Sequence, residues 1–352
     1  MGIKLGPLLE TRPIKVEELA NQKVAIDGYN ILYQFLSSIR QADGNLLTDS
    51  EGRVTSHLSG LFFRISTLVD NGIRPCIIFD GKPPKLKRKL LEERRLRKIK
   101  AEIEWEAAIS AGDVETARTK AQQTTRLDNE MLVESKRLLD LLGIPWFDAP
   151  SEGEAQVAFL IKSGKVDYGA SQDYDTILFG AKNFVRNLTL SNRRKLPKQN
   201  KWVAVTPEII DIDLSLSNLE ITREQLVDVS ILMGTDFNPG IDGIGPKKGL
   251  KLIKECGNAE EALLKIGKNI DNLDEIRNLF LNPEVDDFEP VWNNPDGQGL
   301  ENFLCNNYRF NRDRVMKTIE IYTNSKSKAR HCLLYTSPSP RDRTRSRMPS
   351  SA

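Results

Sequence analysis

The chain has 352 residues, with 39% hydrophobic and 28% charged side chains and a formal net charge of +2. This length and composition fit one large α/β domain with additions, or two domains of ordinary size, under a heavily charged surface. No apolar stretch approaches the roughly 18 residues of a membrane helix, and no apolar signal segment follows Met1. We therefore expect an intracellular protein without membrane contact.

Cysteine and histidine are scarce. The four cysteines lie far apart and include no Cys-x-x-Cys pair, so neither a disulfide framework nor a zinc finger is expected. Of the two histidines, His57 falls in an expected helix and His331 in a polar tail. A catalytic triad with a histidine base is therefore not expected either. Carboxylates with a bound metal are the chemistry that remains.

Short apolar runs alternate with helical segments from residue 1 to about residue 230. The expected strands are residues 23–27, 75–80, 167–171, 183–188 and 202–205. The expected helices are residues 30–40, 56–70 and 152–163. Such alternation is typical of buried strands in a parallel sheet. We therefore expect an α/β fold with a mostly parallel central sheet flanked by helices.

Further segments stand apart from this core. Residues 84–128 are strongly polar and helical in propensity but lack the apolar face of a core helix. Residues 236–256 hold a glycine-rich turn that leads into a lysine-rich helix. Three prolines predict an irregular segment over 274–303, and the pattern of 311–322 predicts a last helix.

From about residue 326 the composition changes abruptly to Ser, Pro and Arg. Such a segment cannot bury enough surface to order itself, and it is either a basic nucleic-acid tail or a cloning or frameshift artefact. The expected division of the chain is 1–83 and 129–235 for the two parts of the core, 84–128 for a helical insertion, 236–256 for a hairpin element, 257–325 for a C-terminal helical part and 326–352 for the tail.

Acidic residues follow three of the expected strands. Asp27 and Asp80 end apolar runs, and the pair Asp173 and Asp175 follows the run that ends near Ser171. Because the carboxyl ends of parallel strands form one crevice, these acids are expected to share one site. Three more acids complete the expected set: Glu152, Glu154 and Asp236.

A bound metal would relieve the repulsion within this set. Several carboxylates in one crevice cannot all stay ionised unless cations offset them. Oxygen-only ligands suit Mg²⁺, with Mn²⁺ as a substitute. Two such ions about 4 Å apart can activate a water and stabilise the leaving oxygen in phosphodiester hydrolysis.

Each acidic motif also has a purely structural interpretation. Residues 151–154 form a capping-box pattern, and residues 173–175 resemble a surface turn. Asp27 can simply end a strand, and Asp80 can begin a turn. The combination favours the shared site, because three separate strand ends carry acids toward one edge of the sheet.

Basic residues are concentrated just after Asp80. Between residues 81 and 100, ten Lys or Arg stand against two acids, which gives a local charge of +8 in a chain of net +2. Lys87 and Arg94 are seven residues apart and share a helix face, which would overhang the acidic crevice. This face could draw a phosphate backbone toward the metals. A solvated helix without a partner is the alternative.

Residues 240–248 have the form of a helix-hairpin-helix turn. Gly243 and Gly245 permit a tight turn, and Pro246 can open a helix. The amides of a helix start attract phosphate, and Lys247 and Lys248 add charge there. A hairpin of this kind grips duplex DNA by its backbone without reading sequence. An ordinary glycine-rich loop is the alternative.

Tyr33 and Arg40 lie seven residues apart in the helix expected after Asp27. Tyr33 could stack on a base near the crevice, and a core position is the alternative. Both residues are counted among the candidate substrate contacts.

With these residues in view, the chain resembles the flap structure-specific endonuclease family, in the archaeal and eukaryotic branch of the 5′-nuclease superfamily. The resemblance runs from Met1 to about Tyr322. The motifs that carry it are Val24-Ala-Ile-Asp27, Tyr33-Gln-Phe-Leu, Thr55-Ser-His-Leu-Ser-Gly, Phe79-Asp-Gly-Lys-Pro-Pro84, Gly143-Ile-Pro, Ala149-Pro-Ser-Glu-Gly-Glu-Ala155, Ser171-Gln-Asp-Tyr-Asp175, Gly234-Thr-Asp236 and Gly243-Ile-Gly-Pro-Lys-Lys.

The resemblance implies a PIN-like nuclease core in which all seven acids bind two Mg²⁺ ions. It also implies that residues 84–128 form a helical arch over the 5′ single strand. Lys87 and Arg94 match the family's phosphate-contacting pair, Tyr33 its stacking tyrosine and Gly2 the amino-terminal residue near the site. Residues 240–248 match its duplex-binding element, where backbone carbonyls also hold a K⁺ ion.

The activity that the resemblance implies is Mg²⁺-dependent hydrolysis of a DNA phosphodiester at a 5′ flap, with 5′–3′ exonuclease activity. The biological role would be removal of RNA-primed flaps in replication and repair, by a monomer in the archaeal cytoplasm or nucleoid or in the eukaryotic nucleus. The family is expected to bind the sliding clamp, but its docking peptide is missing after Tyr322, which leaves clamp binding by this chain open.

Three rival functions remain open at this point. The first is another member of the superfamily, such as a 5′ exonuclease or a Holliday-junction resolvase. The second is a non-catalytic DNA-binding scaffold, against which the presence of all seven acids argues. The third is a metal-dependent phosphatase of small molecules, against which the basic helix and the hairpin argue.

Overall fold

The computed structural model describes residues 3–41, 44–113, 116, 119–120, 126–190, 193–195 and 202–335. Its centre is a seven-stranded sheet of order β1-β9-β6-β5-β2-β3-β4. The strands are β1 (Glu10–Pro13), β2 (Lys23–Asp27), β3 (Arg74–Phe79), β4 (Trp146–Asp148), β5 (Tyr168–Ala170), β6 (Asn183–Arg186) and β9 (Glu208–Asp211). Strands β6, β5, β2, β3 and β4 pair in parallel, whereas β9 and β1 add an antiparallel edge. The predicted mostly parallel sheet is confirmed.

The sheet is buried on both faces. Val24 and Ile26 of β2 belong to one apolar cluster, and Ala25 between them belongs to another on the opposite side. Side chains alternate in this way along any strand, and a strand covered on both faces therefore reads as a continuous apolar run. The apolar run that predicted β2 is continuous because helices cover both faces of the sheet.

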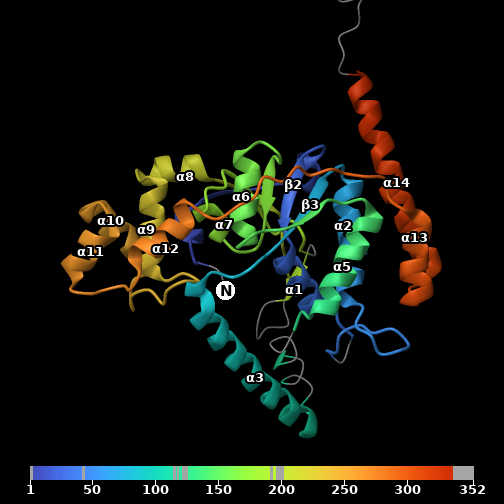
Figure 1. Cartoon of the computed structure of the whole chain (residues 1–352), viewed down its shortest axis with the longest axis horizontal. Coiled ribbons are helices and arrows are strands. Elements are labelled where there is room, and N and C mark those ends of the chain that lie inside the picture. Colours follow the sequence, from blue (N-terminus) through green and yellow to red (C-terminus); the bar gives the residue numbers. More distant parts are fainter. Residues whose placement is uncertain are drawn as a thin grey trace, which may run out of the picture.

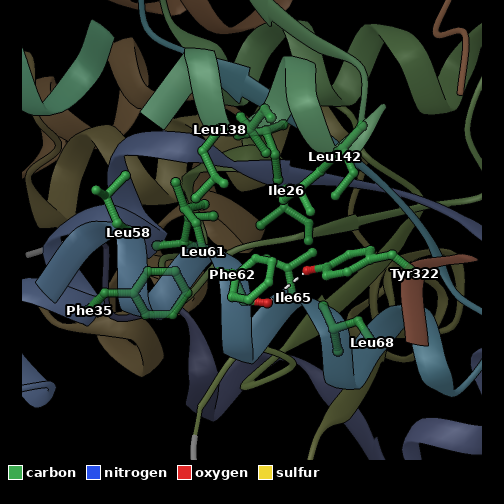
Figure 2. Close-up of a cluster of buried hydrophobic side chains, with 14 of the residues drawn as sticks. Ile26, Phe35, Leu58, Leu61, Phe62, Ile65, Leu68, Leu138, Leu142 and Tyr322 are labelled. Carbon is green, nitrogen blue, oxygen red and sulfur yellow. Dashed lines mark hydrogen bonds between the residues drawn. The ribbon is translucent and has the colours of Figure 1, made fainter. Parts of the chain in front are cut away.

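Helices α1 (Gly28–Ser38), α2 (Ser56–Asp70) and α5 (Asn129–Leu142) form one layer, and α6 (Gly153–Lys162) packs on the other face of β2, β3 and β5. The last helix, α14 (Arg312–Tyr335), packs against α2. There the Tyr322 hydroxyl donates a hydrogen bond of 2.8 Å to the carbonyl of Phe62, within the apolar cluster of Figure 2.

A second group of helices lies at the other end of the molecule (Figure 1). It contains α8 (Ile212–Leu219), α9 (Arg223–Met233), α10 (Pro246–Cys256), α11 (Ala259–Ile266) and α12 (Leu273–Leu281). Helix α3 (Arg88–Ser110) projects away from the body, as Figure 1 shows. None of the helices in the described ranges combines the length and the apolarity that crossing a bilayer would take.

Several expected elements differ in the structure. Residues 202–204 form β8, which pairs with β7 (Arg193–Lys195) in a separate two-stranded sheet, because β9 and β1 occupy the edge of the central sheet. The segment expected to be irregular contains α12 up to Leu281 and α13 (Gly297–Glu301), and lacks regular structure only between them. The prolines of 274–303 all fall within that part, which explains why helices form on either side.

The last helix is also longer than expected. It continues past Tyr322 to Tyr335, so the first residues of the predicted disordered tail are helical. Residues 323–335 contain no glycine or proline, and extending an existing helix costs far less than starting one. The remainder of the predicted tail, 336–352, lies outside the described residues.

Candidate functional site

Two of the predicted acids stand at adjacent strand ends. Asp27 is the last residue of β2 and caps α1, where its Oδ1 accepts a hydrogen bond of 2.9 Å from the Asn30 backbone N–H. Asp80 follows β3, the parallel neighbour of β2. The sheet continues in opposite directions from β2, toward β3 and toward β5, and the ends of strands at such a switch point form a crevice.

Asp173 and Asp175 follow β5, on the other side of β2. Asp173 accepts a hydrogen bond of 3.3 Å from the Asn30 side-chain amide, which links it to the helix that Asp27 caps. Asp175 is buried at the start of α7 (Asp175–Leu178). Its carboxylate accepts a hydrogen bond of 3.0 Å from the Ile3 backbone N–H. The beginning of the described chain therefore reaches the site. Gly2, a predicted contact, lies outside the described residues.

Glu152 and Glu154 stand at the start of α6, beside Asp80. The Asp80 carboxylate accepts a hydrogen bond of 2.7 Å from the Gly153 backbone N–H. A Cβ atom on Gly153 would lie 2.8 Å from that oxygen, so only glycine permits this approach. Glu152 takes the position before the helix without a side-chain capping bond, so the capping-box interpretation is wrong and its carboxylate is free for other partners.

Asp236 joins the strand-end acids through basic partners. Arg94 of α3 donates to both Asp236 oxygens, at 2.8 and 3.0 Å. Lys87, at the start of the same helix, pairs with Glu152 and lies 3.6 Å from Asp236. The predicted overhang of the basic helix above the acids is confirmed at these two positions.

The acids lie close enough to change each other's ionisation. Burial, together with the carboxylates of Asp80 and Asp173, raises the pKa of Asp27 to about 7. Burial also raises the pKa of Asp175 to about 7, with Asp236 and Asp173 acting in the same direction. Acids that are far apart in the sequence therefore form one electrostatic unit.

The remaining glutamates belong to the same unit. Burial raises the pKa of Glu154 well above its usual range, and the carboxylates of Asp175 and Asp27 add to this. Burial raises the pKa of Glu152 too, although Lys87 opposes the shift. Burial by itself would lower the pKa of Lys87, but Glu152 more than offsets that and the pKa is raised. The lysine therefore carries a charge among the acids.

The chemistry of this donor set fits a hard divalent cation. All seven candidate ligands are carboxylates. Burial and neighbouring carboxylates raise the pKa values of Asp27, Glu154 and Asp175, and a cation would offset that concentration of negative charge. As the side chains stand, no group of three acidic, histidine or cysteine side chains within the described ranges is disposed to hold a metal ion. Hydrogen bonds and ion pairs to Lys87, Arg94, Gly153 and Ile3 orient several carboxylates instead.

Tyr33 and Arg40 differ in their placement. Tyr33 is on α1 with 37% of its surface exposed, and the Lys98 ammonium of α3 lies 5.0 Å from its ring centroid. The core interpretation of Tyr33 is therefore wrong. Helix α1 ends at Ser38, so Arg40 is not on it, contrary to the prediction. The Arg40 guanidinium donates to the carbonyls of Leu36 and Gly44, so these contacts support the local turn.

The predicted hairpin precedes α10. Gly243 has a φ of +79°, Gly245 is the residue before the helix, and Pro246 is its first residue. Lys247 and Lys248 follow in the first turn, where the backbone N–H groups have no partner within the helix. The expected glycine turn and helix start are both present.

Two protein-family models match this chain. The XPG N-terminal domain model matches residues 1–101, and the XPG I-region model matches residues 143–236. The flap endonuclease 1 of Archaeoglobus fulgidus is 47% identical over 321 residues, which cover 91% of this chain and 95% of that protein. The chain belongs to the flap endonuclease 1 family. The flap endonuclease 1 of Pyrococcus furiosus is 48% identical over 324 residues, covering 91% and 94% of the two chains.

Solved structures agree with this family membership. The flap endonuclease-1 from Methanococcus jannaschii superposes with a TM-score of 0.74 at 39% identity, covering 93% of this chain and all of that one. The catalytic core of Rad2 in complex with DNA substrate has a TM-score of 0.68 at 25% identity, covering 90% and 97%. Members of the flap endonuclease 1 family are metal-dependent nucleases, and so is this chain.

Sequence reasoning missed several polar contacts of the site. Three polar groups donate hydrogen bonds to the acids: the Ile3 N–H to Asp175, the Asn30 side-chain amide to Asp173 and the Ser171 hydroxyl to Asp27. Ser171 follows β5 directly and Asn30 lies in the first turn of α1, so polar residues near a strand end were an available signal. The Lys98–Tyr33 contact had no signal, because it joins two separate helices.

Proposed function

We propose that this chain hydrolyses a DNA phosphodiester near the junction of a 5′ flap with duplex DNA, at the seven-carboxylate cluster. As a member of its family the chain is a structure-specific 5′-flap endonuclease. The observation that carries the assignment of the site is the convergence of acids from separate strand ends beneath Lys87 and Arg94. This combination places negative ligands and phosphate-binding cations side by side.

The cluster would hold two Mg²⁺ ions, with Mn²⁺ as a substitute. The proposed ligands are Asp27, Asp80, Glu152, Glu154, Asp173, Asp175 and Asp236. When bound, such ions lower the pKa of a water and stabilise the charge on a phosphoryl group. The ion pairs of Lys87 and Arg94 would then exchange their carboxylate partners for substrate phosphate.

Lys87 and Arg94 would stabilise the negative charge that develops on the scissile phosphate. Both cations are already within reach of the acids, so little side-chain reorganisation is needed when DNA arrives. Tyr33 would stack on a base close to this point, after Lys98 leaves its ring. Gly2 and Arg40 are further proposed substrate contacts. The 5′ strand would pass beneath residues 84–128.

The duplex would be held at the hairpin before α10. The N–H groups of its first turn together with Lys247 and Lys248 suit a phosphate backbone. Carbonyls of the turn around Gly243 and Gly245 are the proposed site of a K⁺ ion. We further propose that the chain acts as a monomer. Flap removal in replication and repair would be its role.

A labelled 5′-flap duplex tests the assignment of the site. We expect Mg²⁺-dependent cutting near the junction that a chelator abolishes, and strongly reduced cutting with normal DNA binding by Asp175→Ala. Asp213→Ala is the matched control, because Asp213 is an exposed acid on α8. Unimpaired turnover by Asp175→Ala would remove the two-metal assignment. Gapped, nicked and four-way substrates, run in parallel, measure the preference for flaps and any exonuclease activity.

A further inference from the structure

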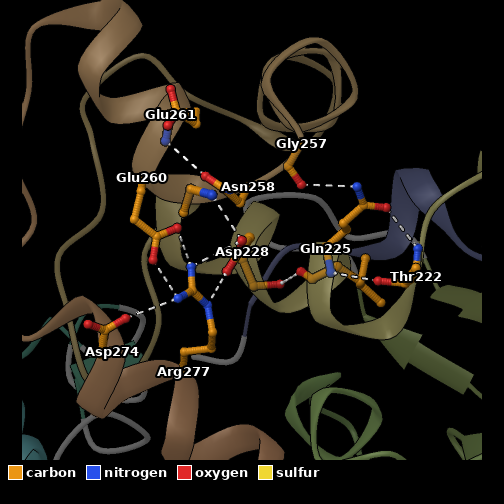
Figure 3. Close-up of polar contacts among 12 residues, drawn as sticks. Thr222, Gln225, Asp228, Gly257, Asn258, Glu260, Glu261, Asp274 and Arg277 are labelled. Carbon is orange, nitrogen blue, oxygen red and sulfur yellow. Dashed lines mark hydrogen bonds and ion pairs between the residues drawn. The ribbon is translucent and has the colours of Figure 1, made fainter.

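A partly buried arginine joins three helices of the C-terminal group (Figure 3). Arg277 of α12 donates to both oxygens of Asp228 on α9, at 2.8 and 3.2 Å. It also donates to both oxygens of Glu260 on α11, at 2.6 and 2.7 Å, and to Asp274 at 3.1 Å. The Asp228 side chain is only 5% exposed and the Arg277 side chain 20%. We call Arg277, Asp228 and Glu260 the brace.

The brace also fixes the connection between α10 and α11. Asp228 accepts a hydrogen bond of 2.9 Å from the Ala259 backbone N–H, at the start of α11. One helical turn earlier on α9, Gln225 donates 3.0 Å to the carbonyl of Gly257, which follows the end of α10. Helix α9 therefore holds the C-terminal end of α10, the helix whose first turn is the proposed duplex-binding site.

The other end of α9 leads directly to Asp236. The Thr235 N–H donates to the Asn238 carbonyl at 3.0 Å, and the Asn238 amide donates to the Ile231 carbonyl at 2.8 Å. Gly240 (φ +73°) packs so closely on Gly234 that a Cβ atom would lie 2.3 Å from the Gly234 nitrogen. Asp236 thus extends from a tight, internally bonded turn that is hydrogen-bonded to the end of α9.

We propose that Arg277 is a positioning residue that sets where the DNA is cut. Helix α9 connects the proposed duplex-binding helix α10 with the proposed metal ligand Asp236. The brace fixes α11 and α12 on α9, and Asp228 and Gln225 together hold the connection between α10 and α11. The distance between the held duplex and the reacting phosphate then depends on the brace. This inference rests on the proposed roles of Asp236, Lys247 and Lys248.

The chemistry of the brace suits a geometric role. A buried ion pair gains little net stability over apolar packing, because both charges lose their hydration. A guanidinium with fixed donor directions does, however, impose one arrangement on two carboxylates. An apolar contact among α9, α11 and α12 would tolerate small sliding of the helices, whereas five hydrogen bonds from Arg277 do not. Arg277 therefore defines geometry more than it adds stability.

The test is the position of the cut. A flap duplex with a non-migrating junction and labels on both strands gives one product length for each cleavage position. With Arg277→Met we expect products from neighbouring phosphates to appear. Because a small misplacement of reacting groups lowers rates steeply, the rate at the wild-type position should fall about tenfold or more. The KM should rise less than the single-turnover rate falls.

Two further variants separate position from folding. Arg277→Lys keeps the positive charge but loses the planar guanidinium with its fixed donor directions. We expect a product pattern between those of the wild type and Arg277→Met. Lys265→Met is the matched control, since it removes an exposed pair between α11 and α10, and we expect the wild-type pattern. If Arg277→Met fails to fold, Glu260→Gln takes its place, because Glu260 is 42% exposed and its loss leaves Asp228 paired.

The overturning result is a lower melting temperature of the brace variants with an unchanged product pattern, since the brace would then only stabilise the fold. A failure of the proposed site looks different. If Asp236→Ala cuts as fast as the wild type, the assignment of Asp236 as a metal ligand is wrong whatever Arg277 does. If the double variant Lys247→Ala, Lys248→Ala binds duplex DNA as tightly as the wild type, the assignment of the duplex-binding helix is wrong.

Discussion

Lys87 shows how one residue can serve both the free protein and the proposed reaction. Its ammonium is largely shielded from solvent and pairs with Glu152, and this partner keeps its pKa raised despite burial. A cation held in this way is charged at neutral pH. The side chain is therefore preorganised for a phosphate that arrives beside the carboxylates.

Replacing Lys87 by Ala should slow the chemical step more than it weakens binding. The loss of one preorganised charge at a reacting phosphate is expected to lower the single-turnover rate by about 10² to 10³. Single-turnover cutting of a flap duplex under saturating enzyme measures this rate, and DNA affinity is measured separately. Lys182→Ala, which removes an exposed lysine paired with Asp213, is the control. Equal losses in affinity and rate would make Lys87 a binding residue only.

Helix α3 has little support from packing over much of its length. Leu96 and Ile103 are 57% and 63% exposed, and its ion pairs at Glu92 and Glu93 are on the surface. Exposed i,i+3 and i,i+4 pairs stabilise a helix only slightly. The basic residues on this helix are therefore presented on a segment that can open locally at low free energy.

Limited proteolysis with a Lys- and Arg-specific protease should detect this difference. We expect cuts within α3 before cuts in α2 or α9, because local opening exposes its backbone. Flap DNA bound to Asp175→Ala, which prevents turnover, should slow the α3 cuts about tenfold or more at saturating DNA. An unbranched duplex, which offers no single strand to pass beneath α3, should protect less. If both DNAs leave the α3 cuts unchanged, the arch assignment loses its support.

The elements that carry the acids could be predicted because burial on both faces produces a continuous apolar run, as in β2 and β3. The edge strands could not. β1 is exposed along its whole length, so its residues Glu10 to Pro13 show no apolar pattern. The place of β8 outside the central sheet depends on the pairing of β9 and β1 at its edge, and local sequence does not contain that information.

The acidic set itself could be predicted from the strand ends, but the contacts of its members could not. The end of α1 at Ser38, which places Arg40 outside the helix, carried no sequence signal. The pairing of Arg94 with Asp236 joins residues from α3 and from the turn after α9. Only the whole fold brings these two segments together.

At the scale of the whole molecule, helix α14 packs on the outer side of the helical layer that covers the sheet, against α2. Tyr322 packs its ring 5.9 Å from that of Phe62 and bonds the Phe62 carbonyl through its hydroxyl. Its ring is surrounded by residues of α2 and α5 (Figure 2). Two residues that are 260 positions apart in the sequence therefore share one core, and the stability of the molecule should respond to this contact.

The Tyr322 hydroxyl gives that contact a pH signature. Burial raises its pKa well above the usual value near 10, so the folded protein keeps the phenol neutral where the unfolded chain ionises. A raised folded pKa means that stability is fully present below pH 10 and is lost as the pH rises. Each pH unit above 10 should cost about 1.4 kcal/mol through this group.

The effect of Tyr322→Phe on the free energy of unfolding should therefore change sign between pH 7 and pH 11. At pH 7 the variant loses one hydrogen bond and should be about 1 kcal/mol less stable. Above about pH 10 it lacks the group that penalises the folded state, so the gap should close and then reverse. Denaturant unfolding at pH 7, 9 and 11 measures the difference, with Tyr33→Phe as an exposed control. A gap that stays constant from pH 7 to 11 would show that the Tyr322 hydroxyl reaches solvent and that α14 does not seal the core.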